Sequence, residues 1–324
     1  MDGVLIIDKP AGMTSHDVVA RVRRILREQR VGHTGTLDPF ATGVLVVLVG
    51  RATRLAQFLS GADKEYEAVI RLGYATDTGD LMGEPVGAGL GGERDLSNSA
   101  EAATQLRPFA VPTAIEIESA LGDLRGQMEQ VPPMYSAKKV GGQKLYDLAR
   151  RGAAVERKPV NITIHEFEVL REGMLTSHDD GSFDLAVRVV CSAGSYIRVL
   201  AEDFGKRLGV GAHLAALRRT RAGRFLATDA TTLEHLQQIV GDGLLADIMV
   251  PPNAALSHLP FVHLSTGDEQ RIGNGIPIRP LIELSGNWVE GEMVRMRHAD
   301  GQLLAIGCYD ASKRLLHPRV VLAT

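Results

Sequence analysis

Uninterrupted and alternating apolar positions predict the strands of this chain. The longest unbroken apolar run, Val44–Val49, is rich in β-branched residues and lies between two glycines. This pattern is typical of a strand buried on both faces. Apolar residues alternate with other residues in Tyr66–Leu72 and, more regularly, in Phe183–Cys191. Such alternation predicts strands with one buried face.

Helical spacing of apolar residues appears in two other segments. Residues 16–30 carry valine, isoleucine and leucine at helical intervals, and Thr14 or Ser15 is suited to cap the helix. Residues 199–208 have the same spacing, and Gly209 follows where a helix would stop. The chain therefore alternates predicted strands with predicted helices.

The later part of the chain shows different signals. Residues 83–100 are rich in Gly, Ala and Ser without a period, which predicts an exposed loop. The proline-rich stretch 251–260 is typical of a linker. Beyond it, two strand-like runs, 293–298 and 302–309, flank an Asp-Gly turn signal. We expect a small all-β domain at this end.

Composition restricts the class of protein. At 324 residues the chain exceeds the size at which one core stops growing, about 250–300 residues, so we expect a large domain and a smaller one. Apolar residues make up 44% and charged residues 23%, which excludes a disordered, collagenous or coiled-coil protein. The six-residue apolar run is far shorter than the ~20 residues of a membrane helix.

The beginning of the chain and its cysteines favour the cytoplasm. The first residues lack the basic and apolar regions of a secretory signal. Two cysteines, Cys191 and Cys308, are too few for a disulfide framework or a four-cysteine zinc site. We therefore expect a reducing, cytoplasmic environment.

The net charge of −3 conceals two basic segments. Residues 133–160 hold seven Lys/Arg against two acids, and residues 198–224 hold the same numbers, so each segment has a net charge of +5. Local patches rather than total charge decide phosphate binding. The segments are either nucleic-acid contacts or solvated helix faces.

One irregular stretch holds a single carboxylate. Residues 32–43 contain three glycines, a proline and several hydroxyl residues around Asp38. Scaffold-held loops are common places for catalytic groups, and the following proline confines Asp38 to extended or turn geometry. The alternative is an Asx-turn that only shapes the chain.

This stretch, GHTGTLDPFATGVL, resembles the signature of the TruB family of bacterial tRNA pseudouridine-55 synthases. Six further motifs follow the family's order. They are DKPAGMTS (8–15), KEY (64–66), TDTGD (76–80), PMYSAK (133–138), GSYIR (194–198) and the segment from AHL to Arg219 (212–219). A set of motifs in one order is far more specific than one motif.

The resemblance implies an architecture. The family has an α+β catalytic domain with a mainly antiparallel mixed sheet, which we expect over residues 1–252. Residues 274–277 and their flanking strands resemble a PUA-type RNA-binding domain, which we expect over residues 253–324. A monomer without an obligate protein partner is also expected on family grounds.

The resemblance also implies the chemistry, which is isomerisation of uridine to pseudouridine at position 55 of the tRNA T-arm. Asp38 matches the essential aspartate, as nucleophile or as stabiliser of a cationic sugar. Arg198 matches the arginine that pairs with it. Tyr66 matches the tyrosine that stacks on the base and is a candidate for removing its C5 proton; packing in the core is the alternative.

Other matches imply RNA contacts. His33 matches a residue that touches RNA where the base leaves its stack. Tyr196 and Leu217 match positions that line the pocket. Further RNA contacts are expected from the basic segments, at Lys138, Arg218 and Arg219. Lys9 and Pro10 belong to a family motif for which we expect a structural role.

No metal or cofactor is expected. The histidines lack metal-ligand spacing, and neither a GxGxxG nor a P-loop pattern occurs. Isomerisation involves no net redox change or group transfer. Three alternatives stay open: a guide-RNA-dependent synthase, an RNA chaperone with an idle site, and a hydrolase that uses Asp77 or Asp80 as its second carboxylate. Residues 76–85 resemble the stand-alone bacterial form.

Overall fold

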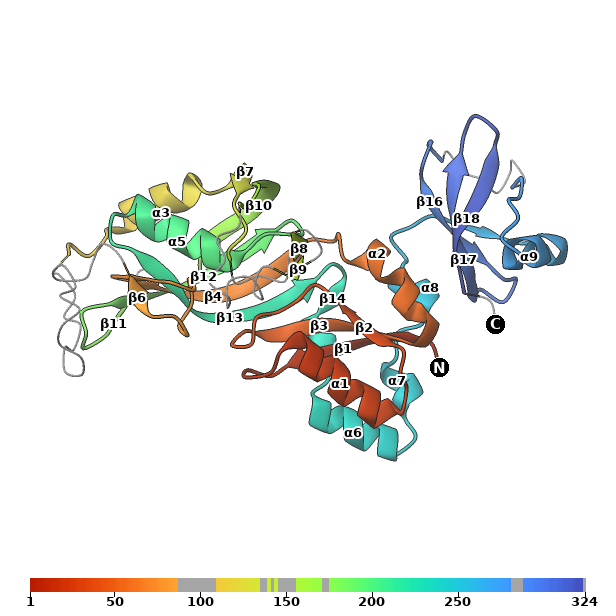
Figure 1. The fold of residues 1–324 in the computed structure, drawn as a ribbon, viewed down its shortest axis with the longest axis horizontal. Helices are drawn as coiled ribbons and strands as arrows, with labels where there is room; N and C mark the ends of the chain where they lie inside the picture. Colours follow the sequence, from red (N-terminus) through yellow and green to blue (C-terminus); the bar gives the residue numbers. More distant parts are fainter. Residues whose placement is uncertain are drawn as a thin grey trace.

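The chain folds around two β-sheets, a large one in the N-terminal part and a small one at the C-terminal end (Figure 1). The computed structural model describes residues 1–86, 109–134, 139–140, 143–144, 156–170, 175–280 and 288–322. No helix of this part is both long and apolar enough to cross a membrane.

The large sheet is mixed and mainly antiparallel. Its central order is β1-β3-β13-β4-β12-β10-β7, and β2, β11 and β14 pair at its sides. Only β13 and β3 run parallel, through Arg218–Thr42 and Arg219–Gly43. The strands are β1 (Gly3–Lys9), β2 (Val31–Thr34), β3 (Thr42–Val49), β4 (Lys64–Leu72), β7 (Gly126–Gln130), β10 (Val160–Val169), β11 (Thr176–Ser177), β12 (Phe183–Cys191), β13 (Ala212–Ala222) and β14 (Phe225–Leu226).

Strand β3 is buried on both faces, as its unbroken apolar run predicts. Leu45 and Val47 face the helices α1 (Ser15–Leu26) and α6 (Leu233–Gly241). Val44 and Val46 face the opposite side and pack into a different cluster. Strands β4 and β12 alternate as predicted, and the bounds of β12 match its predicted range.

Helices cover the two halves of the sheet separately. Figure 1 shows α1 and α6 over the half built on β1–β3, and α3 (Ala114–Gly122) and α5 (Ile197–Arg207) over the other half. Phe204 of α5 packs on Phe167 of β10 within the core of that half. The residues of the candidate active site, described below, come from both halves of the sheet, so both halves are needed to form it.

The two predicted helices form with shifted ends. Thr14 caps α1 in a capping box with Asp17, as one of the two predicted caps. The helix ends at Leu26, earlier than predicted, because Arg27 adopts a left-handed conformation with φ of 52°. Gly209, with φ of +71°, follows the end of α5 as predicted.

The C-terminal sheet has the order β15-β16-β17-β18 and its own core. The predicted hairpin is confirmed by β16 and β17. A helix, α9, joins the strands, and the sequence pattern did not predict it. The elements are β15 (Phe261–His263), α9 (Thr266–Gly273), β16 (Met293–Arg297), β17 (Leu303–Asp310) and β18 (Leu315–Val321).

The stretch 251–260 is packed rather than a free linker, so that expectation was wrong. It contains the short helix α8 (Pro252–Ala255), and Ala255 and Leu256 are fully buried. Ile306 and Val320 of the C-terminal sheet join the same apolar cluster. The C-terminal sheet therefore packs directly on the N-terminal part.

Small elements complete the fold. Part of the predicted loop 83–100 forms β6, which pairs with β5, and residues 87–100 lie outside the described part. The remaining elements are β5 (Ala75–Thr76), β6 (Pro85–Val86), β8 (Lys139–Val140), β9 (Gln143–Lys144), η1 (Gly50–Leu55), α2 (Ala56–Leu59), η2 (Ala227–Asp229) and α7 (Leu245–Ile248).

Candidate active site

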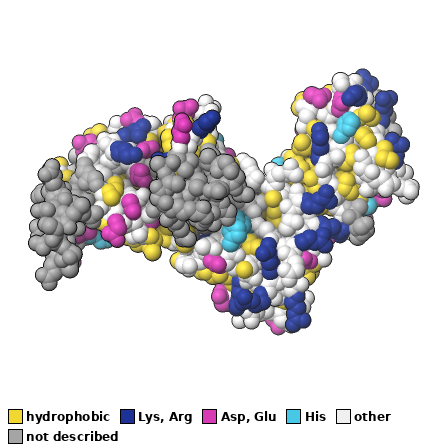
Figure 2. Space-filling view, in the orientation of Figure 1, with side chains coloured by type: hydrophobic (Ala, Val, Ile, Leu, Met, Phe, Trp, Pro, Cys, Tyr) yellow, Lys and Arg dark blue, Asp and Glu magenta, His cyan; other side chains and the backbone are white. Residues whose placement is uncertain are grey.

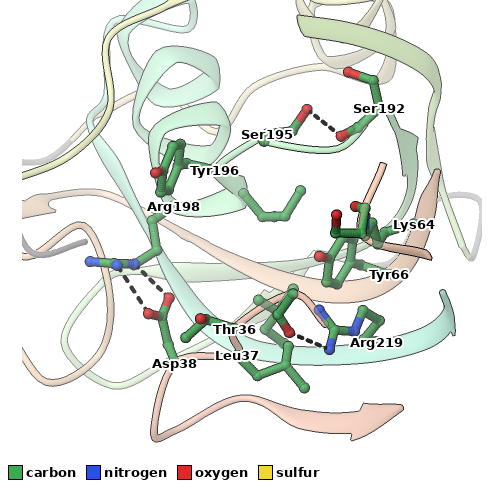
Figure 3. Close-up of a pocket in the computed structure, with 15 residues that line it drawn as sticks. Thr36, Leu37, Asp38, Lys64, Tyr66, Ser192, Ser195, Tyr196, Arg198 and Arg219 are labelled. Atoms are coloured by element: carbon green, nitrogen blue, oxygen red, sulfur yellow. Dashed lines mark hydrogen bonds and ion pairs between the residues drawn. The ribbon is translucent and has the colours of Figure 1, made fainter. Parts of the chain in front are cut away.

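A cavity of about 250 Å³ lies where the loop after β2 meets β4, β13 and the start of α5 (Figure 3). It brings together six residues predicted for the site: Asp38, Tyr66, Tyr196, Arg198, Leu217 and Arg219. The other lining residues are Gly35, Thr36, Leu37, Ser60, Lys64, Ser192, Gly194, Ser195 and Ile197.

Asp38 and Arg198 form a two-pronged ion pair in this cavity (Figure 3). Arg198 Nε donates to Asp38 Oδ2 at 2.8 Å, and its Nη2 donates to Oδ1 at 3.1 Å. The third nitrogen of Arg198, Nη1, donates to the carbonyl oxygen of Thr78 at 2.9 Å. Two parallel hydrogen bonds fix the direction of the Asp38 carboxylate, and the guanidinium charge favours its ionised form.

Asp80 lies on the far side of the same guanidinium. Its Oδ2 is 3.6 Å from Arg198 Nη1. The side chain of Asp80 is otherwise committed, because Oδ1 accepts hydrogen bonds from the hydroxyl of Thr78 and the backbone N–H of Met82. Arg198 is thus clamped between two carboxylates, and only Asp38 reaches the cavity.

The side chain of Lys9 holds the loop that carries Asp38 through hydrogen bonds. Lys9 is fully buried at the end of β1, and its Nζ donates to the carbonyl oxygens of Pro10, Pro39 and Ala41. Burial lowers the pKa of Lys9 to about 8, with Asp38 opposing the change. The expected structural role of Lys9 is therefore extended: it supports the catalytic loop itself.

Two further contacts fix the loop. The hydroxyl of Ser15 accepts from the N–H of Leu37 at 2.9 Å and donates to its carbonyl at 3.2 Å. Gly43 has φ of +97°, and a Cβ there would lie 2.2 Å from the carbonyl oxygen of Arg219. Only glycine allows β3 to approach β13 so closely.

Burial and charge compete for the pKa of Asp38. Burial is the largest effect and raises it above the ordinary value. The charge and hydrogen bonds of Arg198 pull it down, while the negative charge of Asp80 adds to the rise. The carboxylate is consequently more basic than a solvated aspartate, although it keeps its cationic partner.

Tyr66 and Arg219 form the opposite side of the cavity in Figure 3. Tyr66 is buried on β4, and burial raises the pKa of its phenol, while the charge of Arg219 and a hydrogen bond to it act in the opposite direction. Arg219 is 1% exposed and donates to the carbonyl oxygens of Val44 and Gly35. Arg219 therefore lies in the pocket wall and not on an open surface.

Tyr196 caps the start of α5 and belongs to the cavity wall. Its backbone N–H donates to Gln130 Oε1 at 2.8 Å, and its carbonyl oxygen accepts from Gln130 Nε2 at 3.1 Å. This pair of bonds anchors the segment that leads to Arg198. Leu217 contributes an apolar surface from β13.

Two predicted RNA-contact residues, His33 and Arg218, do not line the cavity. His33 lies on β2 beside His16, with ring centroids 5.5 Å apart, and burial lowers its pKa to about 4. Arg218 points away and forms a two-pronged pair with Asp8, at 3.0 and 2.8 Å. Lys138 lies outside the described residues.

The second basic segment is largely neutralised, which its local composition did not predict. Within residues 198–224, Arg198 pairs with Asp38, Arg218 pairs with Asp8, and Arg221 pairs with Glu65. These carboxylates come from β1, β4 and the loop after β2, all far away in the sequence. Counting charges along this segment therefore overstates its free positive charge.

Sequence reasoning gave three residues of its motifs no role at an isomerase site: Lys64 and Ser195, which line the cavity, and Asp80, which contacts Arg198. Lys64 lies two positions before Tyr66 on the same face of β4, so the strand period could have identified it. Its Nζ donates to the carbonyl oxygens of Ser60 and Ala62. The Ser195 hydroxyl donates to the Ser192 carbonyl oxygen across the loop before α5. The role of Asp80 depends on a fold-level contact that no local pattern reveals.

The geometry does not favour a two-carboxylate hydrolase. Asp38 is the one acidic residue among the described residues that line the cavity. Asp80 lies behind Arg198, and Asp77 accepts a hydrogen bond from the backbone of Glu84. A retaining or inverting pair needs both carboxyl groups to face the substrate.

Comparisons with known proteins identify the family of the chain. Residues 23–197 match the model of the TruB family pseudouridylate synthase N-terminal domain, and residues 198–257 match the tRNA pseudouridylate synthase B C-terminal domain. The tRNA pseudouridine synthase B of Geobacillus thermodenitrificans is 44% identical over 86% of each chain. That of Moorella thermoacetica is 42% identical over 99% of each chain.

Solved structures with the same fold include a chain of the archaeal box H/ACA sRNP Nop10–Cbf5 complex. It has a TM-score of 0.69 and 26% identity over 99% of this chain and 86% of its own. A chain of a Cbf5–Nop10–Gar1 complex has a TM-score of 0.71 and 27% identity over 99% and 85%. The fold, the aspartate loop and the matched models together establish that this chain belongs to the TruB family of pseudouridylate synthases.

Proposed function

We propose that this protein isomerises uridine 55 in the T-arm of tRNA to pseudouridine, with Asp38 as the catalytic carboxylate. The observation that carries the proposal is the two-pronged Asp38–Arg198 pair inside a cavity lined by Tyr66. The relatives at 42–44% identity bear the name tRNA pseudouridine synthase B. We place the reaction in the cytoplasm and assign it to a monomer.

The reaction breaks the bond between N1 of the base and C1′ of the sugar, turns the base, and joins C5 to C1′. Asp38 attacks the base or stabilises the cationic sugar while the base is detached. Arg198 holds the carboxylate toward the cavity in either case. The raised pKa of Asp38 makes its carboxylate a better nucleophile than a solvated aspartate.

Tyr66 stacks on the extruded base; after its own phenolic proton leaves to solvent, the phenolate takes the C5 proton and returns to the neutral phenol. Burial raises the pKa of the Tyr66 phenol, so the free enzyme holds it neutral. The positive charge of Arg219 lowers that pKa and stabilises the phenolate that proton transfer requires. Arg219 is thus assigned to the pocket chemistry as well as to substrate binding.

The remaining contacts position the RNA. Tyr196 and Leu217 supply walls for the flipped base, whose extrusion costs a few kcal/mol. His33, with its pKa lowered to about 4, acts as a neutral group where the base leaves the loop. Arg218, which lies outside the cavity, is assigned to an RNA contact, and so is Lys138.

Position mapping tests this proposal. An unmodified tRNA transcript is treated with the purified protein alone, and pseudouridine is located by carbodiimide-dependent reverse-transcription stops. We expect one stop, at position 55, and none in a transcript with cytidine there. Modification at another position would contradict the assigned site. Modification only after addition of guide RNA and partner proteins would favour the guide-dependent alternative.

A further inference from the structure

Five exposed arginines follow one another from α1 to the C-terminal sheet. They are Arg24, Arg27, Arg30, Arg54 and Arg319, and we call them the arginine ridge. Figure 2 shows dark blue groups in succession from the part of the molecule that holds α1 to the C-terminal part, with few magenta groups between them. None of the five belongs to the two basic segments that the sequence singled out.

The charge of the ridge is not neutralised by the described part of the protein. Within the described part of the chain no ridge arginine forms an ion pair with a carboxylate, whereas Arg51, Arg188 and Arg221 are all paired with carboxylates. The nearest acid in sequence, Glu28, uses its carboxylate to accept a hydrogen bond from a backbone N–H at 2.8 Å. The ridge therefore presents free positive charge.

Backbone contacts make the ridge continuous. The carbonyl oxygen of Arg30 accepts from the N–H of Gly50, at the start of η1, at 2.7 Å. From η1 the guanidinium of Arg54 reaches the carbonyl oxygen of Val321 in β18. Arg319 lies two positions earlier on that strand. Residues far apart in the sequence thus meet along one surface.

The ridge is also joined to the cavity. Arg30 is followed by β2, which has four residues and leads into Gly35–Asp38 of the cavity wall. Four residues of a strand span about 13 Å. A nucleic acid whose loop enters the cavity can therefore reach the ridge with the stem behind the loop.

Helix stability does not explain this arrangement. Cations near the end of α1 complement its dipole, which accounts for Arg24 but not for Arg30, Arg54 or Arg319, which lie outside the helix. Arg27 adopts φ of 52°, a conformation that glycine would adopt without steric cost. An arginine at this position is unfavourable for the backbone, so its charge calls for another explanation.

A membrane surface does not fit the ridge. A membrane-binding amphipathic helix exposes its apolar face. In α1 that face is buried, with Val18 and Val22 packed into the core. The exposed groups of the ridge are guanidinium groups, whose planar, forked arrangement of donors is suited to bind phosphate.

We propose that the arginine ridge binds the phosphate backbone of the double-stranded stem that carries the target loop of the tRNA. The inference rests on the proposed function for the identity of the RNA. Stems are recognised through shape and backbone, and each neutralised phosphate adds to the salt dependence of binding. The ridge sets the affinity and orientation of the substrate without touching the reacting base.

The test compares Arg24→Gln/Arg27→Gln/Arg30→Gln with the charge-preserving Lys variant at the same three positions. Dissociation constants for a tRNA transcript are measured by filter binding at several salt concentrations. The Gln variant is expected to bind at least about tenfold more weakly, with the slope of log Kd against log salt reduced by about 2 to 3. The Lys variant is expected to keep the wild-type slope. An unchanged slope in a folded Gln variant would overturn the proposal.

A second substrate identifies the part of the RNA involved. A minimal hairpin carries the target loop on a truncated stem that does not reach the ridge. Wild type and the Gln variant should bind this hairpin equally; an equal loss on hairpin and tRNA would overturn the assignment to the stem. The dissociation constant is measured without turnover. Weaker binding caused by loss of the ridge can therefore be told apart from loss of isomerase activity.

Arg27→Gly provides a readout that a purely structural role would not give. Glycine relieves the left-handed backbone, so the melting temperature should rise. The same change removes one phosphate contact, so the salt slope should fall by about 1. A variant that is more stable and binds tRNA with an unchanged slope would remove Arg27 from the ridge.

Discussion

Lys9 Nζ donates a 2.6 Å hydrogen bond to the carbonyl oxygen of Ala41, a residue 32 positions further along the chain. This bond joins the end of β1 to the loop that carries Asp38. Two further carbonyl oxygens, those of Pro10 and Pro39, accept from the same ammonium group. The loop that carries Asp38 is therefore built on a buried cation.

Replacing Lys9 with methionine should destabilise the protein and slow catalysis. The change removes the Lys9 donor from three carbonyl oxygens. That of Pro39 keeps a hydrogen bond from the N–H of Gly12, whereas that of Ala41 lies in a fully buried environment. We expect the free energy of unfolding to fall by about 2–3 kcal/mol, since each unsatisfied buried group costs about 1–3 kcal/mol. Urea denaturation measures the loss. Lys206→Met, on a side chain that is 68% exposed, serves as the control and should change stability by less than about 0.5 kcal/mol.

Gly43→Ala should separate β3 from β13. The new Cβ would lie 2.2 Å from the carbonyl oxygen of Arg219, and φ at this position is +97°. We expect a loss of about 2–4 kcal/mol in the free energy of unfolding. Gly12→Ala is the matched control, because φ is +82° there but nothing lies within 4 Å of the added Cβ. Equal losses in the two variants would show that the clash contributes nothing.

The pH dependence of the chemical step should report Asp38. The reaction needs its carboxylate, and burial raises the pKa of that group above its ordinary value of 3.8. The single-turnover rate should therefore rise with pH along an acid limb whose midpoint lies above 3.8. His33 should add no step at neutral pH, since its pKa is lowered to about 4. A midpoint at or below 3.8 would contradict the buried, Asp80-facing environment of Asp38.

Asp80→Asn should both slow the reaction and move its acid limb. Asp80 clamps Arg198 from behind, so its loss loosens the direction of the Asp38–Arg198 pair. A misplaced catalytic group costs up to about 100-fold, and we expect a fall in kcat of about tenfold or more. Because the charge of Asp80 raises the pKa of Asp38, the acid limb should shift to lower pH. If the variant is slower but the low-pH midpoint of its rate profile does not change, Asp80 has only a structural role.

Local pattern predicted β3, β4 and β12, whose burial follows their apolar positions, but made no prediction for β1, β7, β10 or β13 of the same sheet. The apolar run of β3 is buried on both faces, and β12 begins and ends where its alternation does. The end of α1 was mispredicted because residues 27–30 contain no glycine or proline to mark a stop, while Arg27 leaves the helix through its left-handed backbone. The packed stretch around Leu256 was mispredicted because proline content says nothing about tertiary contacts.

The site was accessible to sequence reasoning only through the family motifs. Asp38 and Arg198 are 160 positions apart, and no spacing rule connects them. The free charge of the arginine ridge was hidden for the same reason. Basic residues near Arg218 looked free along the chain but meet Asp8 and Glu65 from other strands. Ion pairing is a property of the fold rather than of a segment.

Tritium release from a tRNA transcript labelled at C5 of uridine tests the central claim most directly. Wild-type protein and Asp38→Asn are assayed in parallel, without other proteins, guide RNA, nucleotide or added metal. We expect wild type to release one equivalent of tritium. The variant should release none, while its tRNA affinity stays within roughly tenfold because asparagine preserves the shape of the site. Release by the variant at a rate near that of wild type would remove Asp38 from catalysis, and tight binding without release by wild type would contradict a stand-alone synthase.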